Sequence, residues 1–257
     1  LDFAVTLQDL DGDTVTHPDG IQITIVDDIP EITSTSTNLG SIEVDETGLT
    51  DTTPRVANEA NFIQDATGTD TVFDVTYGAD GKKSLVYSLD VTNATSGLVD
   101  TKTGQPITLV KDTVTGDIIG QITVSGVDIS VFKIEMDGTT GAVTLTQYRP
   151  VYHSAHQGPD VVVDHNEAIT LNANTIRLTA TATDNDNDVV THQINNIGAK
   201  FAFRDDGPSV GTPHTTNTTG IDEKHLQFGS APDATKLSEE GTLDIRFGAD
   251  QRVNSGV

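Results

Sequence analysis

The sequence contains no cysteine, no tryptophan and only one methionine among its 257 residues. Without cysteine no disulfide is available, so a fold that needs cross-linking must use another kind of link, and bound metal is the obvious candidate. Aromatic residues make up only 5% of the chain and hydrophobic residues 35%, which suffices for modest cores in one large or two smaller domains. No stretch is long and apolar enough to cross a bilayer.

Basic residues are also scarce. Only 14 lysines and arginines accompany 39 aspartates and glutamates, which gives a formal net charge of −25. Such a chain repels phosphate backbones and anionic lipids, so neither nucleic acid nor membrane insertion is expected. The natural complement of this charge is a cation.

The motifs of common catalytic centres are missing as well. The sequence has no Gly-x-Ser-x-Gly elbow, no phosphate loop and no Gly-x-Gly-x-x-Gly. Acidic pairs such as a glycosidase requires are abundant, but 39 carboxylates produce pairs by chance. We therefore expect a protein that is not an enzyme.

Many short segments alternate apolar and polar residues, which is the pattern of strands with one buried face. These segments are 1–7, 21–25, 72–75, 85–89, 107–109, 122–124, 143–145, 176–178, 201–203 and 243–247. Turn-forming pairs such as Asp80-Gly81 and Ser125-Gly126 lie between them. The only helical turn that we expect is near 57–62. The pattern predicts an all-β fold of antiparallel, immunoglobulin-like β-sandwich modules.

Several phrases occur twice, which indicates a tandem array. The pairs are Asp27-Asp28-Ile29-Pro30 with Asp205-Asp206-Gly207-Pro208, Val44-Asp45-Glu46 with Ile221-Asp222-Glu223, and Gly78-Ala79-Asp80 with Gly248-Ala249-Asp250. We predict that residues 1–30 are the last strands of one module, 31–206 a complete module, and 207–257 the start of a following or split module. Proline at each junction favours extended backbone and hence a short, stiff connector. The two end pieces are too short to close a sandwich of the middle module's size, so we expect other chain segments to complete them.

Two aspartate ladders are the strongest chemical signal, Asp9-x-Asp11-x-Asp13 and Asp184-x-Asp186-x-Asp188. Alternate residues of an extended chain point to one side, so three carboxylates would crowd together unless the segment curves around a cation. Ca²⁺ prefers about six to eight oxygen ligands, and such a segment supplies several. The ladder is not an EF-hand, because Thr14 and Gly20 occupy the positions of the required glycine and glutamate. We expect Ca²⁺ at both ladders.

Further Ca²⁺ sites are predicted at the module junctions, where four carboxylates would repel one another without a bridging cation. The two sets are Asp27, Asp28, Asp45, Glu46 and Asp205, Asp206, Asp222, Glu223. Calcium bound there would lock adjacent modules into a rod, and a chelator would release them. The alternative is that these residues only solvate turns and keep the array monomeric.

The stretch 148–167 concentrates tyrosine and histidine. His153, His156 and His165, with Asp160 or Asp164, are numerous enough for a zinc site, although a hydrogen-bonded structural cluster is the stronger interpretation. A second interpretation is a contact patch for a glycan or peptide, because tyrosine supplies amphipathic contact area. Its members would be Tyr148, Tyr152, His153, His156 and His165.

Four phrases taken together resemble the type I secretion repeat of large RTX adhesins. They are Thr181-Ala-Thr-Asp184-Asn-Asp186-Asn-Asp188, Phe203-Arg-Asp205-Asp206-Gly207-Pro208, Val44-Asp45-Glu46-Thr47-Gly48-Leu49 and Val143-Thr-Leu-Thr-Gln-Tyr148-Arg-Pro. The resemblance covers 31–206 throughout and both end pieces in part. Asn185 and Asn187 depart from the usual Asp-x-Asp-Gly-Asp, but the three aspartates are kept.

This resemblance implies a secreted adhesin of the bacterial cell surface, built of Ca²⁺-stiffened β-sandwich modules and used in surface attachment and biofilm formation. In such adhesins some modules only extend the fibre, whereas others bind sugars or peptides. The expected function is therefore a structural extender or tip-proximal scaffold module, whose partners are the adjacent modules of the same adhesin. The alternative is a module that binds a host or biofilm glycan or peptide.

Overall fold

The computed structural model describes residues 2–34, 39–60, 62–64, 70–154, 167–210, 214–215, 227, 230, 241–242, 245–246 and 248–250. Within these ranges the chain is all-β, as predicted, and two single turns of 3-10 helix, Ala173–Thr175 and Gly198–Lys200, interrupt the strands. No helix in these ranges is long and apolar enough to span a membrane.

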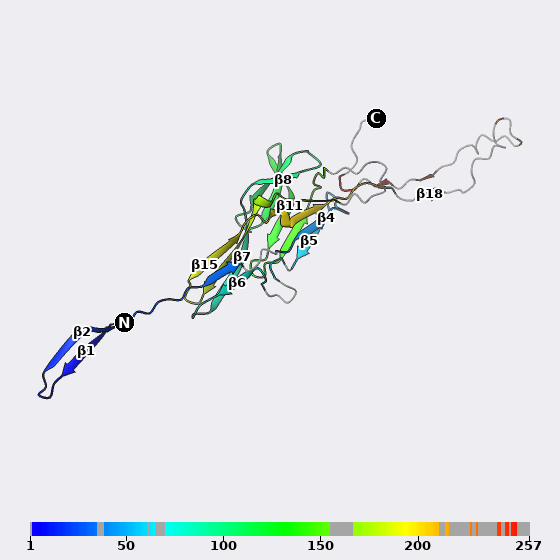
Figure 1. Cartoon of the computed structure of the whole chain (residues 1–257). Coiled ribbons are helices and arrows are strands. Elements are labelled where there is room, and N and C mark those ends of the chain that lie inside the picture. Colours follow the sequence, from blue (N-terminus) through cyan, green and yellow to red (C-terminus); the bar gives the residue numbers. More distant parts are fainter. Residues whose placement is uncertain are drawn as a thin grey trace.

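The strands fall into three groups along the chain (Figure 1). The first group is a hairpin of β1 (Asp2–Gln8) and β2 (Thr14–Gln22). The central body contains β3 (Glu31–Ser34), β4 (Ile42–Asp45), β5 (Arg55–Glu59), β6 (Phe73–Thr76), β7 (Lys82–Val91), β8 (Thr95–Val99), β9 (Pro106–Lys111), β10 (Ile118–Val124), β11 (Val127–Met136), β12 (Val143–Gln147), β13 (Ala168–Thr170), β14 (Ile176–Asp184), β15 (Val189–Ile194) and β16 (Phe201–Arg204). The last group is β17 (Ser209–Val210), β18 (His214–Thr215), β19 (Gly241–Thr242) and β20 (Ile245–Arg246).

Strand pairing in the described ranges stays within these groups. The central body has a six-stranded sheet in the order β5-β12-β11-β10-β9-β8, two three-stranded sheets, β13-β16-β4 and β15-β14-β7, and the pair β3-β6. All these neighbours are antiparallel except β16 and β4. β17 pairs with β20, and β18 with β19. The pairing follows the three predicted parts of the chain, although the division into tandem modules stays a prediction.

The sheets of the central body enclose one hydrophobic core. β14 shows the reason most clearly, because every second residue from Ile176 to Asp184 is buried, as a strand with one covered face requires. The six-stranded sheet meets β16 through Phe132 and Phe203, whose ring centroids are 4.8 Å apart. Such aromatic pairs add about 0.5–1.5 kcal/mol beyond the burial of their area. The core thus holds the two ends of the body in a defined arrangement.

The helical turn predicted near 57–62 is wrong for residues 57–59, which belong to β5. Ala57 pairs with Leu145 of β12, and the Asn58 side chain accepts a hydrogen bond from Thr144 Oγ1 at 2.8 Å. Pairing with the neighbouring strand outweighs the weak local preference for helix.

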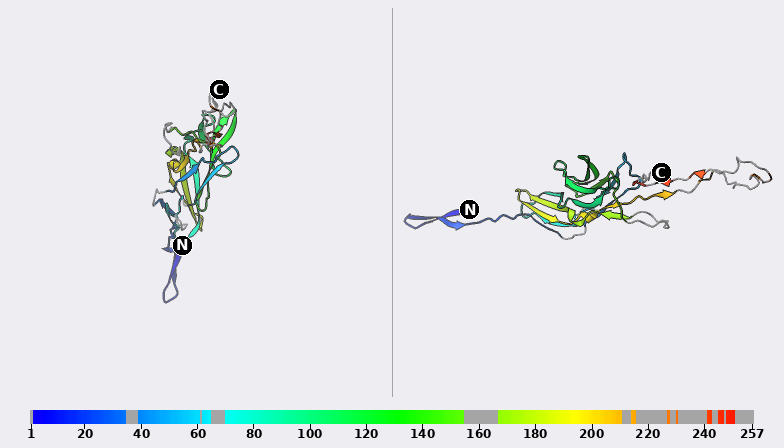
Figure 2. Two further views of the ribbon diagram at one scale, coloured as in Figure 1. Left: turned by 90° about the vertical axis from the view of Figure 1, so that its right-hand side faces the viewer. Right: turned by 90° about the horizontal axis from the view of Figure 1, so that it is seen from above.

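The hairpin β1–β2 projects from one end of the central body (Figure 2) and exposes the side chains that the alternation predicts to be buried. Phe3 is 48% and Leu7 66% exposed. Counted from the first aspartate of each ladder, they occupy the places of Leu178 and Ala182 in β14, which are fully buried. β14 pairs with β7 as well as β15, whereas β1 pairs only with β2 in the described residues. The buried face therefore depends on a neighbour, not on the strand alone.

Candidate metal sites at the two ends of the central body

Strand pairing brings three acidic segments together at the end of the central body that faces the hairpin. β3 is antiparallel to β6, with Glu31 opposite Thr76, so the connector before β3 lies beside the turn after β6. β7 is antiparallel to β14, so that same turn also lies beside the ladder that follows β14. The three segments are the connector 27–28, the turn 78–80 and the ladder 184–188.

Five aspartates meet there in two overlapping groups that share Asp186. One group is Asp27, Asp186 and Asp188, and the other is Asp80, Asp184 and Asp186; within each group one carboxylate oxygen per residue lies within 4.8 Å of the others. Asp184 is completely buried, and its Oδ2 has no hydrogen-bond partner. A buried, unpartnered carboxylate oxygen is costly unless a positive group compensates it.

Hydrogen bonds between the three segments hold this arrangement. The backbone amide of Ala79 donates to Asp28 Oδ2 at 3.1 Å, and Asn185 Nδ2 donates to the Asp80 carbonyl at 2.7 Å. Lys83 Nζ also bonds to Asn187 Oδ1. Asn185 therefore has a structural role, because it joins the ladder to the turn 78–80.

The crowding of carboxylates raises two pKa values in this cluster. Interaction with the adjacent Asp184 side chain raises the pKa of Asp186 to about 6, and loss of solvent and the charges of Asp184, Asp27 and Asp80 add to the effect. The pKa of Asp188 is raised by desolvation first and then by the charge of Asp27. Either a proton or a bound cation relieves this repulsion.

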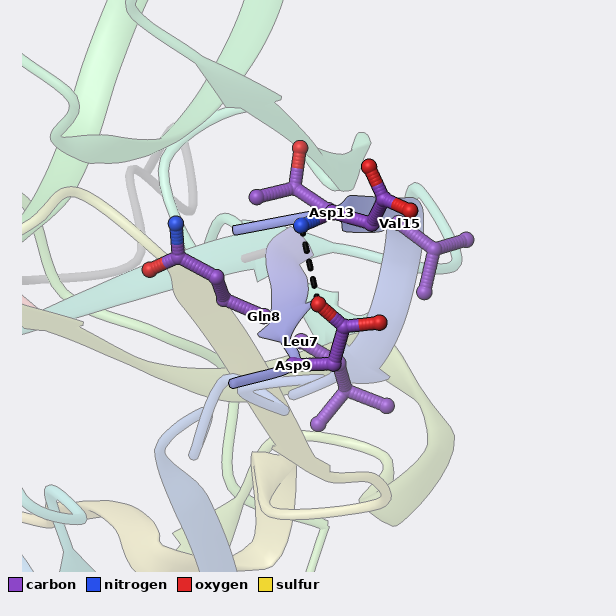
Figure 3. A pocket seen from close by; sticks show the side chains of 6 residues that line it. Leu7, Gln8, Asp9, Asp13 and Val15 are labelled. Atoms are coloured by element: carbon purple, nitrogen blue, oxygen red, sulfur yellow. Dashed lines mark hydrogen bonds between the residues drawn. The ribbon is translucent and has the colours of Figure 1, made fainter. Parts of the chain in front are cut away.

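The ladder itself is a tight turn that occurs twice with the same hydrogen bonds. In the first copy the Asp13 amide donates to Asp9 Oδ1 at 2.9 Å (Figure 3). In the second copy the Asp188 amide donates to Asp184 Oδ1 at 2.8 Å. The fourth residue has positive φ in both, 103° at Gly12 and 85° at Asn187. Asparagine tolerates this conformation better than most side chains, which explains how Asn187 replaces glycine without loss of the turn.

The first ladder stands alone in the described residues. The side chains of Asp9, Asp11 and Asp13 are exposed and bring one oxygen each within 4.8 Å of one another. The hollow beside them is lined by Leu7, Gln8, Asp9, Asp13, Thr14 and Val15, all from the hairpin (Figure 3). No carboxylate from another described segment joins this set, in contrast to the second ladder.

A different cluster lies at the opposite end of the central body. β4 is parallel to β16, and the Glu46 amide bonds to the Arg204 carbonyl at 3.0 Å, so the residues after the two strands, Glu46 and Asp205, are neighbours. With His153 they form a fourth group of possible metal ligands within 4.8 Å. Burial raises the pKa of Glu46 to about 8, and the charges of Asp250 and Asp205 act in the same direction.

A model of DUF5801, described as a domain of unknown function, matches residues 41–198. The chain belongs to the DUF5801 family. No curated protein and no solved structure matches it. The matched range lies within 31–206 and includes Asp80, the second ladder, Glu46 and His153, but not the acidic connectors at 27–28 and 205–206. In this DUF5801 chain both clusters thus combine residues of the matched range with a connector outside it.

The first of the two predicted junction sets is assembled differently in this DUF5801 structure. Asp27 lies with the ladder aspartates Asp186 and Asp188, and not with Asp45 and Glu46, which lie at the other end of the body. For this first set the grouping was wrong because Asp27 and Asp28 precede β3, which pairs with β6, whereas Asp45 and Glu46 lie at the end of β4, which pairs with β16. Asp45 instead accepts the Thr47 amide at 2.8 Å, and Asp222 and Glu223 lie outside the described residues.

The joint between connector and turn is nevertheless the same at both ends. Gly78 has φ of 64° and packs against Asp28, whose carboxyl carbon would lie 2.9 Å from an added Cβ. Gly248 has φ of 68° and packs against Asp206, whose carbonyl carbon would lie 2.8 Å from an added Cβ. Only glycine fits such a close approach with positive φ. The repeated phrase Gly-Ala-Asp is therefore the part of the turn that receives the connector.

Sequence reasoning did not assign a metal role to Asp80 or Asp250. Asp80 belongs to the aspartate cluster, and Asp250 interacts electrostatically with Glu46. The available signal was their place in a phrase that occurs twice.

The tyrosine and histidine residues of 148–154 do not form one surface patch. Tyr152 is 44% exposed, but the His153 side chain is only 3% exposed and bonds to the Phe203 carbonyl through Nε2 at 3.1 Å. Tyr148 is half-buried, and its amide donates to the Val131 carbonyl at 2.8 Å. His156, His165, Asp160 and Asp164 lie outside the described residues.

Proposed function

We propose that this DUF5801 chain is a calcium-stiffened extender or scaffold module of a bacterial surface adhesin, which passes load between neighbouring modules. The observation that supports the proposal most directly is the aspartate cluster formed by Asp27, Asp80, Asp184, Asp186 and Asp188. The resemblance to type I secretion repeats supplies the cellular setting, namely a secreted, fibrous protein that serves attachment and biofilm formation. Its partners would be adjacent modules of the same adhesin.

The donor set suits Ca²⁺ better than other common ions. All five side chains offer carboxylate oxygens. Ca²⁺ accepts about six to eight such oxygens in flexible geometry, whereas Mg²⁺ demands a stricter octahedron. The unpartnered Oδ2 of buried Asp184 and the raised pKa of Asp186 are the features that a bound cation would compensate.

A cation in this cluster would act on stiffness because its ligands belong to different structural parts. Asp27 belongs to the connector, while the other four aspartates belong to the central body, Asp184 at the end of β14 and the rest in the adjoining loops. One ion would therefore fix the direction in which the connector enters the body. Without it, five neighbouring carboxylates repel one another and favour a looser connector.

The same reasoning applies to the first ladder, which we assign to a preceding module. Its turn has the hydrogen bonds of the second ladder, but its connector and its Gly-Ala-Asp turn are not among the described residues. We propose that Asp9, Asp11 and Asp13 bind Ca²⁺ when those partners are present. In this chain the first ladder should bind calcium more weakly than the second.

The proposal is tested by measuring calcium bound to the full chain by isothermal titration calorimetry, together with small-angle X-ray scattering in calcium and in chelator. Calcium is expected to raise the melting temperature and to lengthen and stiffen the particle. In Asp27→Asn the scattering change should be lost while most of the thermal effect is kept, because Asp27 alone comes from the connector. Asp74→Asn, an exposed aspartate of β6, is the matched control. Identical scattering and melting in calcium and chelator would refute the proposal.

A further inference from the structure

The cluster at the far end of the central body differs from the aspartate cluster because it contains an imidazole. Glu46 is completely buried, and the side chains of His153 and Asp205 are 3% and 11% exposed. One ligand atom from each residue lies within 4.8 Å of the other two. These residues come from the segments after β4, after β12 and after β16, which the core brings together.

Existing hydrogen bonds account for one atom of Glu46 and one of His153 and leave another atom of each unpartnered. Glu46 Oε1 accepts from Gln147 Nε2 at 2.6 Å and from the Val151 amide at 2.9 Å, whereas Oε2 has no partner. His153 Nε2 lies 3.1 Å from the Phe203 carbonyl oxygen, which only accepts, so Nε2 carries the hydrogen. In the neutral imidazole Nδ1 then presents a lone pair, and it too has no partner.

The unpartnered atoms face one another. His153 Nδ1 lies 3.6 Å from Asp205 Oδ1, which also lacks a hydrogen-bond partner. This separation is too long for a hydrogen bond, and two lone pairs repel each other in a buried site. It is close to the roughly 3.4 Å between two ligands of one tetrahedral ion with bonds of about 2.0–2.2 Å.

We propose that Glu46, His153 and Asp205 bind a divalent transition-metal ion of the Zn²⁺ class, at a site separate from the calcium-binding aspartates. An imidazole nitrogen with two carboxylates suits zinc and its neighbours, whereas Ca²⁺ prefers oxygen ligands alone. The Phe203 carbonyl and the Gln147 amide orient the ligands from behind, as second-shell groups do in metal sites.

The metal would also connect the turn 248–250 to the central body. Asp250 acts electrostatically on both Glu46 and Asp205, and its Oδ1 has no hydrogen-bond partner among the described residues. Its turn is held by the contact of Gly248 with Asp206. Glu167 also acts electrostatically on Asp205 and has an unpartnered Oε2, so Asp250 and Glu167 are the candidates for a fourth ligand, directly or through water.

The experiment uses the full chain saturated with calcium and titrated with Co²⁺, whose visible absorption reports tetrahedral N/O coordination, followed by displacement with Zn²⁺. The expected result is one tight Co²⁺ per chain. His153→Gln and Glu46→Gln should weaken Co²⁺ binding by a factor of about 100 or more, since even outer-shell changes cost about 10- to 100-fold. His192→Gln, a half-buried histidine of β15 outside the cluster, should leave binding unchanged.

A measurement on the unaltered chain covers the case in which a cluster variant fails to fold. With ¹⁵N-labelled histidine, Zn²⁺ should shift the Nδ1 resonance of His153 and leave Nε2 protonated. A shift confined to other histidines, or an imidazolium with both nitrogens protonated beside Asp205 and no metal uptake, would overturn the proposal. Asp184→Asn should keep the Co²⁺ spectrum, so failure of the calcium proposal is distinguishable from failure of this one.

Discussion

Replacing Asp184 by asparagine should change which protein is the more stable: the wild type in calcium, but the variant, or neither, in chelator. Asp184 is completely buried, its Oδ1 accepts the Asp188 amide at 2.8 Å, and its Oδ2 is unpartnered. Asparagine keeps the first bond, removes one negative charge, and offers an amide hydrogen toward Asp186. In chelator the variant should therefore be at least as stable as the wild type, because repulsion within the cluster decreases.

In calcium the same substitution should lower stability relative to the wild type. Extracellular calcium sites bind with dissociation constants of about 10⁻⁴–10⁻³ M, so about 10 mM calcium stabilises the folded state by about 1.4–2.7 kcal/mol. For a body of this size that corresponds to a rise of about 3–11 °C in melting temperature. Removing the only fully buried carboxylate of the cluster should abolish most of this rise.

The assay is thermal unfolding followed by circular dichroism, over a calcium titration and in chelator. Asp137→Asn is the matched control, because Asp137 Oδ1 also accepts backbone amides in a turn, from Thr139 and Thr140 at 2.8 Å, but lies outside every acidic cluster of the described residues. If calcium raises the melting temperature of Asp184→Asn as much as that of the wild type, the aspartate cluster is not the calcium site. If the variant is in addition less stable than the wild type by the same amount in calcium and in chelator, Asp184 has only a structural role.

Substitutions at three further positions give additional tests. Asp100→Asn should cost about 3 kcal/mol, because buried Asp100 receives two hydrogen bonds from Arg149, at 2.7 and 2.9 Å, and urea unfolding measures the loss. Burial alone would raise the pKa of Asp100, but Arg149 holds the folded pKa below its usual value. The stability that this ion pair contributes is therefore complete above the unfolded pKa and disappears as pH falls through the folded pKa. The urea midpoint of the variant should depend less on pH in acid than that of the wild type. Gly78→Ala should weaken calcium binding in calorimetry, because a Cβ there collides with Asp28 and φ is 64°; unchanged affinity would contradict the close joint. Asn187→Gly should preserve calcium affinity, whereas Asn187→Val should reduce it, because φ is 85° at this position; equal affinity in both variants would argue against the turn.

Local patterns in the sequence were sufficient to predict the all-β class. Alternation along segments such as 176–178 and 201–203 identifies strands because every second side chain of a strand faces the same way. The repeated Asp-Asp-x-Pro phrases predict stiff connectors because proline constrains the backbone locally, whereas the contact of Gly-Ala-Asp with a connector is known only from the structure. The prediction of β1 as a strand was confirmed in the same way, although not its burial.

The partners of each carboxylate depended instead on strand pairing over long distances. Asp27 reaches Asp186 only because β3 pairs with β6 and β7 pairs with β14, and Glu46 reaches Asp205 only because β4 lies parallel to β16. These contacts join residues more than 150 positions apart, and no local pattern specifies them.

His153 illustrates the same limit for a single side chain. Its sequence neighbours Tyr148 and Tyr152 favour a surface patch, whereas the fold turns its imidazole inward to the Phe203 carbonyl and Asp205. The sequence specifies which chemical groups the protein has and where its backbone bends, because both depend on nearby residues. Which of those groups share a site depends on how the sheets pack around a common core, because that packing alone brings the ends of distant strands within ligand distance.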